Sequence, residues 1–209
     1  MSHNDFEKYV DEHAADIRFF VDKAHAARVH VNLHLDEVGY TSCPVHCFIK
    51  ELKDFAPAVC AHPDDILPLY FAVCFHDALT SLRMQYDDVL SIARQRMNEE
   101  QALLAANLVY TLTPLKGKKY KDRYSAAFYE EIRQTPYAPL LLACIHLEQF
   151  KFMFAEAPRD CYNILFDWQI GLNLFLKNIT VPSDDVRLTL PEPFVEHIWN
   201  EFNSVPVGF

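Results

Sequence analysis

One stretch of this chain is apolar around almost the whole circumference of a helix, and it restricts the fold more than any other feature. Residues 69–79 read LYFAVCFHDAL. A helix at the surface keeps a polar stripe, so a helix that is apolar nearly all round belongs in the centre of a fold. Asp64 and Asp65 favour a helix start, and Pro68 is tolerated in a first turn. The sequence therefore predicts a buried central helix over 64–79.

Apolar residues at helical spacing recur on both sides of this segment. Residues 5–35 place apolar side chains every three or four positions, which is the period of an amphipathic helix, and Gly39 and Pro44 lie beyond its end. Alternating apolar and polar residues at 186–190 predict a short extended piece. Further helices are predicted at 45–55, on both sides of a break near Asn98 within 86–112, and at about 122–134, 137–156, 160–178 and 192–203.

These patterns predict an all-α, single-domain helical bundle. The chain has 209 residues, of which 51% are hydrophobic, so it can bury one sizeable core. It contains only four glycines, few for a sheet-rich protein, and no internal repeat or clear linker. We expect one domain over 1–209, with a C-terminal extension at about 180–209.

Charge and composition limit the class of partner. The net charge is −10, and a general nucleic-acid binder needs a basic surface, so no nucleic-acid polymer is expected as a partner. No run of about 18 apolar residues is present, which predicts no membrane span. The polar start lacks the basic and apolar blocks of a signal peptide, so a cytoplasmic location with reduced, buried cysteines is expected. A homo-oligomer is compatible with the sequence.

The step His76-Asp77 interrupts the apolar run. A buried, ionised Asp is costly unless it is paired or coordinated, so this step needs a partner. The residues alone leave two interpretations open. The pair could help to bind a metal ion, or it could be a polar pair bonded to the backbone or to another side chain.

The surrounding sequence favours the first interpretation through a family resemblance. FAVCFHDALTSLRMQYDDV (71–89) resembles the His-Asp helix and following turn of the HD-domain metal-dependent phosphohydrolases. The similarity is closest to the branch of guanosine tetraphosphate hydrolases and their single-domain relatives, and its order and spacing are consistent over roughly 20–155. It is also carried by AHAARVHVN (24–32), GYTSCPVHCFIKEL (39–52), VYTLTPLKGKKYKDRY (109–124) and IRQTPYAPLLLACIHLEQFKF (132–152).

This resemblance implies a metal site. Carried over by motif, the ligands are His46 and the pair His76-Asp77. The family's final Asp falls on Ile145, which cannot coordinate a cation, and its neighbour His146 could substitute or be a hydrogen-bonded core histidine. Mixed His and Asp ligands favour a divalent cation such as manganese.

The resemblance also implies a catalytic set, with Asp77, Thr80 and Ser81 as its candidates. The close relatives carry Glu-Asp where this chain has Thr80 and Ser81. Hydroxyl groups can hold the attacking water but cannot take its proton. Three protein ligands and a water can still make a catalytic metal site. The expected set therefore keeps the means to bind a metal but lacks the carboxylates that activate water in the family.

A basic segment follows at 114–123, the one cationic cluster of an acidic chain. The resemblance implies that Lys116, Lys118 and Arg123 bind substrate phosphates. The alternative is a solvated turn that balances the acidic surface.

Three functions are therefore carried forward. The first is a metal-dependent phosphohydrolase acting on a nucleotide or a nucleotide pyrophosphate. The second is a degenerate HD domain that binds a nucleotide or a protein partner without hydrolysis. The third is a purely structural or interaction domain, in which His76-Asp77 is a residual polar pair.

Overall fold

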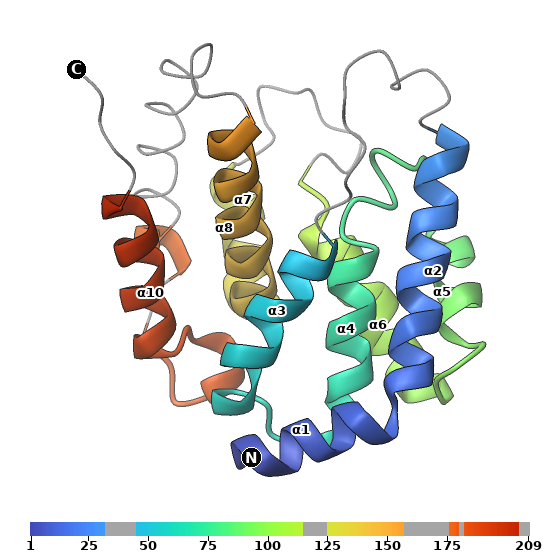
Figure 1. The fold of residues 1–209 in the computed structure, drawn as a ribbon, viewed down its shortest axis with the longest axis horizontal. Helices are drawn as coiled ribbons and strands as arrows, with labels where there is room; N and C mark the ends of the chain where they lie inside the picture. The colour runs from blue at the N-terminus through green and yellow to red at the C-terminus, as the bar shows by residue number, and fades with distance from the viewer. Residues whose placement is uncertain (32–44, 115–124, 157–175, 180–181, 205–209) are drawn as a thin grey trace.

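The structure is a computed structural model that describes residues 1–31, 45–114, 125–156, 176–179 and 182–204 (Figure 1). Helices and turns make up these ranges, which contain no strand, so the all-α prediction is confirmed. The main helices are α1 (His3–Glu12), α2 (Ala14–Val31), α3 (Val45–Phe55), α4 (Ile66–Cys74), α5 (Tyr86–Ala93), α6 (Glu99–Leu112), α7 (Ala126–Gln134), α8 (Ala138–Glu156) and α10 (Glu192–Asn203).

Helix α4 is the centre of the bundle, as its composition predicts. Every residue from Ile66 to Cys74 is buried. Helices α2, α3, α6 and α8 all pack against it, and Figure 1 shows α4 with α2 on one side and α3 on the other. The buried apolar side chains form one cluster that extends from Phe6 in α1 to Phe202 in α10.

Two predicted helix boundaries are wrong. The segment expected as one helix from residue 5 is divided into α1 and α2 at His13, whose N–H donates to Tyr9 O and whose carbonyl accepts from Ile17 N. A one-residue break leaves the apolar spacing almost unchanged, so periodicity did not reveal it. Helix α4 ends at Cys74, so His76 and Asp77 lie in a turn and not on the helix.

The predicted extended piece at 186–190 is also wrong. Val186–Leu188 forms a single 3₁₀ turn. The Asp185 side chain accepts from Arg187 N at 3.0 Å and so closes the turn locally. The predicted helix at 160–178 lies outside the described residues except for its last three positions.

Other boundaries are confirmed where local signals were strong. Asn98 caps α6: its side chain accepts from Gln101 N at 2.9 Å, while Gln101 Oε1 accepts from Asn98 N at 3.2 Å. Helices α3, α8 and α10 lie within a residue of the predicted ranges. Cys60, Cys74 and Cys144 are buried and form no disulfide. Among the described helices, none has the length and apolar character needed to cross a membrane.

Candidate functional site

The turn that carries His76 and Asp77 exists because side chains take over the last carbonyls of α4. The final carbonyls of a helix lack intrahelical partners. Arg28, from α2, donates to Cys74 O at 3.1 Å and 3.2 Å, and also to Ala24 O at 3.2 Å. The Nδ1 atom of His76 lies 2.9 Å from Val73 O. These bonds replace the next helical turn and end α4 at Cys74.

Asp77 has found the partner that a buried carboxylate needs. Its Oδ1 accepts a hydrogen bond from Arg28 Nη2, and the two side chains are 23% and 11% exposed. In the described structure this matches the alternative in which Asp77 is bonded to another side chain. The pair is electrically balanced, because one guanidinium meets one carboxylate. The Asp77 backbone carbonyl accepts from Thr80 Oγ1 at 3.1 Å and from Ser81 N at 2.8 Å, which folds the turn back on itself.

His76 is held as a neutral ring with one nitrogen available. Its bond to Val73 O makes Nδ1 the donor, and this assignment leaves Nε2 as an acceptor. The ring lies edge-on to Phe48, with centroids 5.0 Å apart. Burial lowers the pKa of His76, and the Arg28 charge lowers it further, while Asp77 opposes both. A neutral imidazole whose Nδ1 is held by a carbonyl is the arrangement that metal-binding histidines use.

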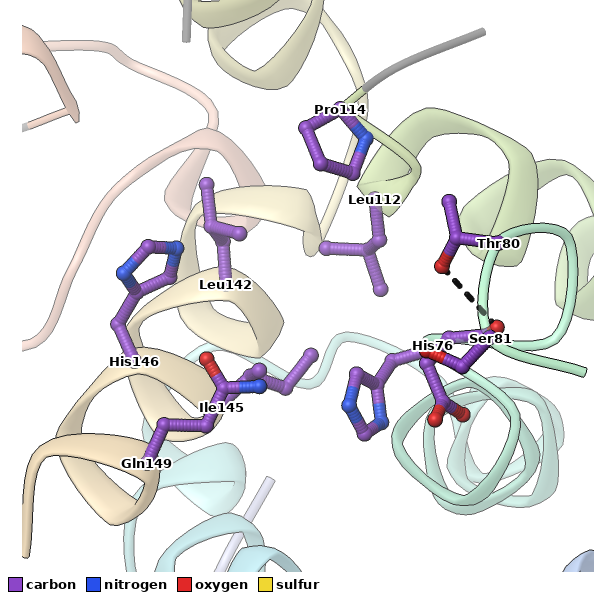
Figure 2. A pocket seen from close by; sticks show the side chains of 10 residues that line it. His76, Thr80, Ser81, Leu112, Pro114, Leu142, Ile145, His146 and Gln149 are labelled. Carbon is purple, nitrogen blue, oxygen red and sulfur yellow. Dashed lines mark hydrogen bonds between the residues drawn. The ribbon is translucent and has the colours of Figure 1, made fainter. Parts of the chain in front are cut away.

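The turn forms one wall of a pocket of about 130 Å³. Figure 2 shows His76, Thr80 and Ser81 facing α8 across the pocket, with Leu112 and Pro114 from the end of α6 between the two walls. The pocket therefore brings together six residues that the sequence analysis named, from two parts of the chain. The full lining is His76, Asp77, Thr80, Ser81, Leu112, Pro114, Leu142, Ile145, His146 and Gln149.

The metal set is only partly within the described structure. His46 belongs to α3, but its side chain lies outside the described residues, as do Lys116, Lys118 and Arg123. Within the described ranges, no three His, Cys, Asp or Glu side chains are grouped so as to hold a metal ion. The described residues do not complete a metal site, because Asp77 is occupied by Arg28 and Ile145 stands where a further ligand was expected.

The residue that sequence reasoning missed is Arg28. An Arg in the helix predicted at 5–35 gave no sign that it would reach a residue 49 positions away. The requirement that Asp77 have a partner was the only signal, and it did not identify which one. Gln149 was also missed, although it follows Ile145 by four residues and so shares that face of α8.

Chemically, the pocket offers hydrogen-bonding groups against an apolar wall. The Thr80 and Ser81 hydroxyls, the Gln149 amide and the His76 imidazole supply donors and acceptors. Small-molecule sites combine a few such groups with apolar walls.

Comparisons of the chain with protein-family models, with curated proteins and with solved structures found no match in any of the three.

Proposed function

We propose that this pocket binds a phosphate group of a nucleotide or a related phosphoester. The observation that carries the proposal is the Arg28–Asp77 pair at the pocket. A lone carboxylate would repel phosphate, but Arg28 compensates the charge of Asp77. Hydroxyl and amide donors of Ser81 and Gln149 are then available for phosphate oxygens.

The size of the pocket limits what part of the ligand it could hold. Pockets that enclose drug-sized ligands measure about 300–1,000 Å³. At about 130 Å³, this pocket suits one phosphate group or a hydrated cation rather than a whole nucleotide. The rest of the ligand would bind elsewhere. Pro114 lines the pocket and the basic segment follows it directly in the sequence, so Lys116, Lys118 and Arg123 are proposed to bind outer phosphates.

Calorimetric titration with phosphate, pyrophosphate, and guanine and adenine nucleotides tests the proposal. Each ligand is titrated with EDTA present and again with manganese present. We expect Ser81→Ala to weaken binding about fivefold to tenfold, the effect of one lost hydrogen bond. Ser91→Ala, at an exposed serine of α5, is the matched control and should leave the affinity unchanged. If no phosphate-bearing ligand binds under either condition, the proposal is wrong and the structural-domain alternative is favoured.

Metal-dependent phosphohydrolysis is the second candidate function. The observation that favours it is the neutral His76 ring, in which Nδ1 is held by Val73 O and Nε2 is the nitrogen with an acceptor lone pair. The resemblance adds His46 and Asp77 as the further ligands of a divalent cation, with manganese proposed. A bound cation would polarise the phosphate and activate water. For Asp77 to contribute, its carboxylate would have to exchange Arg28 for the cation.

Metal analysis of untagged protein, followed by a hydrolysis assay on the same nucleotides, tests this candidate. We expect Ile145→Asp, which supplies a carboxylate at the position the family uses, to raise manganese affinity. Leu142→Asp is the matched control, since it adds the same charge to the same wall one helical turn away. Turnover that survives His76→Ala unchanged would show that this pocket is not the active site.

A further inference from the structure

Helices α3, α8 and α10 meet at a second group of buried charges, which we call the charge cluster. It consists of Glu51 from α3, Glu148 and Lys151 from α8, and His197 from α10. Glu51 is 2% exposed and Glu148 is 5% exposed. At 100° per residue, Glu148 and Lys151 lie on a different face of α8 from the pocket residues, so the charge cluster is separate from the pocket.

The contacts in the charge cluster are close and involve every member. Lys151 Nζ lies 2.6 Å from Glu148 Oε1 and 3.2 Å from Glu51 Oε1. His197 Nε2 lies 3.2 Å from Glu51 Oε2. That oxygen accepts no well-aligned hydrogen bond from the described residues. Glu51 Oε1 therefore meets both Lys151 Nζ and, at 3.5 Å, His197 Nε2, whereas Oε2 lies near His197 without a hydrogen bond from the described residues.

The charges in this cluster do not balance without an additional proton. Among the described residues, two carboxylates and one ammonium leave one negative charge uncompensated, and an unpaired charge in a buried position is costly. A proton on Glu51 removes that charge. Burial raises the pKa of Glu51, the neighbouring Glu148 carboxyl raises it further, and Lys151 and His197 oppose them.

Two ionisable neighbours of Glu51, Lys151 and Cys144, stay in one state. Burial lowers the pKa of Lys151, but its hydrogen bond to Glu148 more than compensates, so the net shift is upward and the amine stays charged. Burial raises the pKa of the Cys144 thiol well above its usual value, so this neighbour from α8 stays neutral. The variable proton of the cluster is therefore assigned to Glu51, which joins α3 to α10 through its contact with His197.

The contact between Glu51 and His197 is one of several that hold α10, which also buries Phe194, Ile198 and Phe202. Helix α10 lies at one side of the bundle next to α3 and α8 (Figure 1). Its ring contact with α3 is the stack of Phe194 on Phe55, with centroids 4.3 Å apart. His197 follows Phe194 by three residues and so presents its ring to the same side, 5.3 Å from Phe55. The polar link between Glu51 and His197 adds to this stack.

We propose that the charge cluster is a proton-dependent latch that keeps α10 docked on α3 while the proton is bound and loosens α10 when the proton leaves. The direction follows from the charges. A carboxyl whose pKa is raised in the folded state favours folding at low pH, and this contribution is lost as the pH rises through the raised value. The window therefore begins above 4.5, the ordinary value for Glu51, and extends upward. Loosening of α10 would return Glu51, Glu148 and Lys151 to water.

Hydrogen exchange of peptides that cover α10, measured from about pH 5 to about pH 9, tests the latch. After correction for the intrinsic exchange rate, we expect protection of α10 to fall by up to about tenfold per pH unit within the titration window. Protection of α6 should stay constant. Glu51→Gln keeps an uncharged polar group at the joint and should make the α10 profile flat. Glu196→Gln removes a carboxylate from the exposed face of α10 and should behave like the wild type.

Three outcomes would overturn the latch. One is constant protection of α10 in the wild type. The second is an unchanged pH profile in Glu51→Gln. The third is an equal change in α6 and α10, which would indicate global unfolding rather than local release. Because the first and third need only wild-type protein, the proposal can be refuted even if Glu51→Gln does not fold.

Discussion

The Arg28–Asp77 pair and the charge cluster differ in the balance of their charges. At the turn after α4, one guanidinium, Arg28, meets one carboxylate, Asp77. In the charge cluster, two carboxylates share one ammonium, Lys151. The carboxylates of the charge cluster are also more deeply buried than Asp77, so both the number of charges and their burial make a bound proton favourable there. The first group carries no net charge, and the second should respond to pH.

The same contrast appears in the histidine and the glutamate that accompany these groups. The pKa of His76 is lowered by burial, so the folded state resists protonation and stability is lost as the pH falls below 6.5. The pKa of Glu51 is raised by burial, so stability is lost as the pH rises above 4.5. The pocket and the charge cluster should therefore contribute opposite slopes to the pH dependence of stability.

The largest effect is expected from Arg28→Met, which leaves Asp77 without its cation. The loss in free energy of unfolding should be about 2–4 kcal/mol, below that of a fully buried pair because Asp77 is partly solvated. Urea denaturation measures it. The double variant Arg28→Met/Asp77→Asn should be less destabilised than the single one. Arg94→Met, which breaks the exposed pair with Glu99, is the control and should leave the urea midpoint nearly unchanged.

A smaller effect is expected from Lys151→Met, because a proton can replace the missing charge. The loss should be about 1–3 kcal/mol near pH 8, discounted for the partial exposure of Lys151, and less near pH 5, where a carboxyl of the charge cluster takes up a proton. Urea denaturation at both pH values measures the two losses in free energy of unfolding. Lys53→Met breaks a pair with Glu7 at the surface and controls for loss of a lysine. Equal losses at both pH values would contradict the charge count.

The smallest of the three effects concerns how the free energy of unfolding of EDTA-treated protein decreases at acidic pH, a part of the pH profile that we call the acid limb. His76 should contribute a loss of at most about 1.4 kcal/mol per pH unit below its ordinary value, the limit for one proton. His76→Leu removes the titrating ring and should flatten this limb relative to the wild type. His3→Leu, which replaces a half-exposed histidine, is the control and should leave the slope of the acid limb unchanged. If both variants retain the wild-type slope, His76 is not the titrating group.

Much of the fold was predictable from local signals. The spacing of apolar residues predicted α8 and α10, and the Asn98 cap predicted the start of α6. The apolar run at 69–79 correctly predicted the buried centre. These signals act within a few residues along the chain, where periodicity and capping are decisive. They failed at Cys74, where the helix end depends on Arg28 from another helix.

The candidate site was predictable as a set of residues but not as a set of contacts. His76, Asp77, Thr80 and Ser81 do face Ile145 and His146 across one pocket. The partner of Asp77 could not be predicted, because neither apolar spacing nor a motif records which side chain crosses between packed helices.

By itself, the sequence determined most of the described helical segments, which helix is central, and that an Asp in the apolar run needs a partner. Tertiary structure alone decided the partners, which for Glu51 are Lys151 and His197, 100 and 146 positions away. The physical reason is that burial removes water, so a charged group must pair with whatever packing places beside it. Both the balanced pair at the pocket and the unbalanced charge cluster result from that packing.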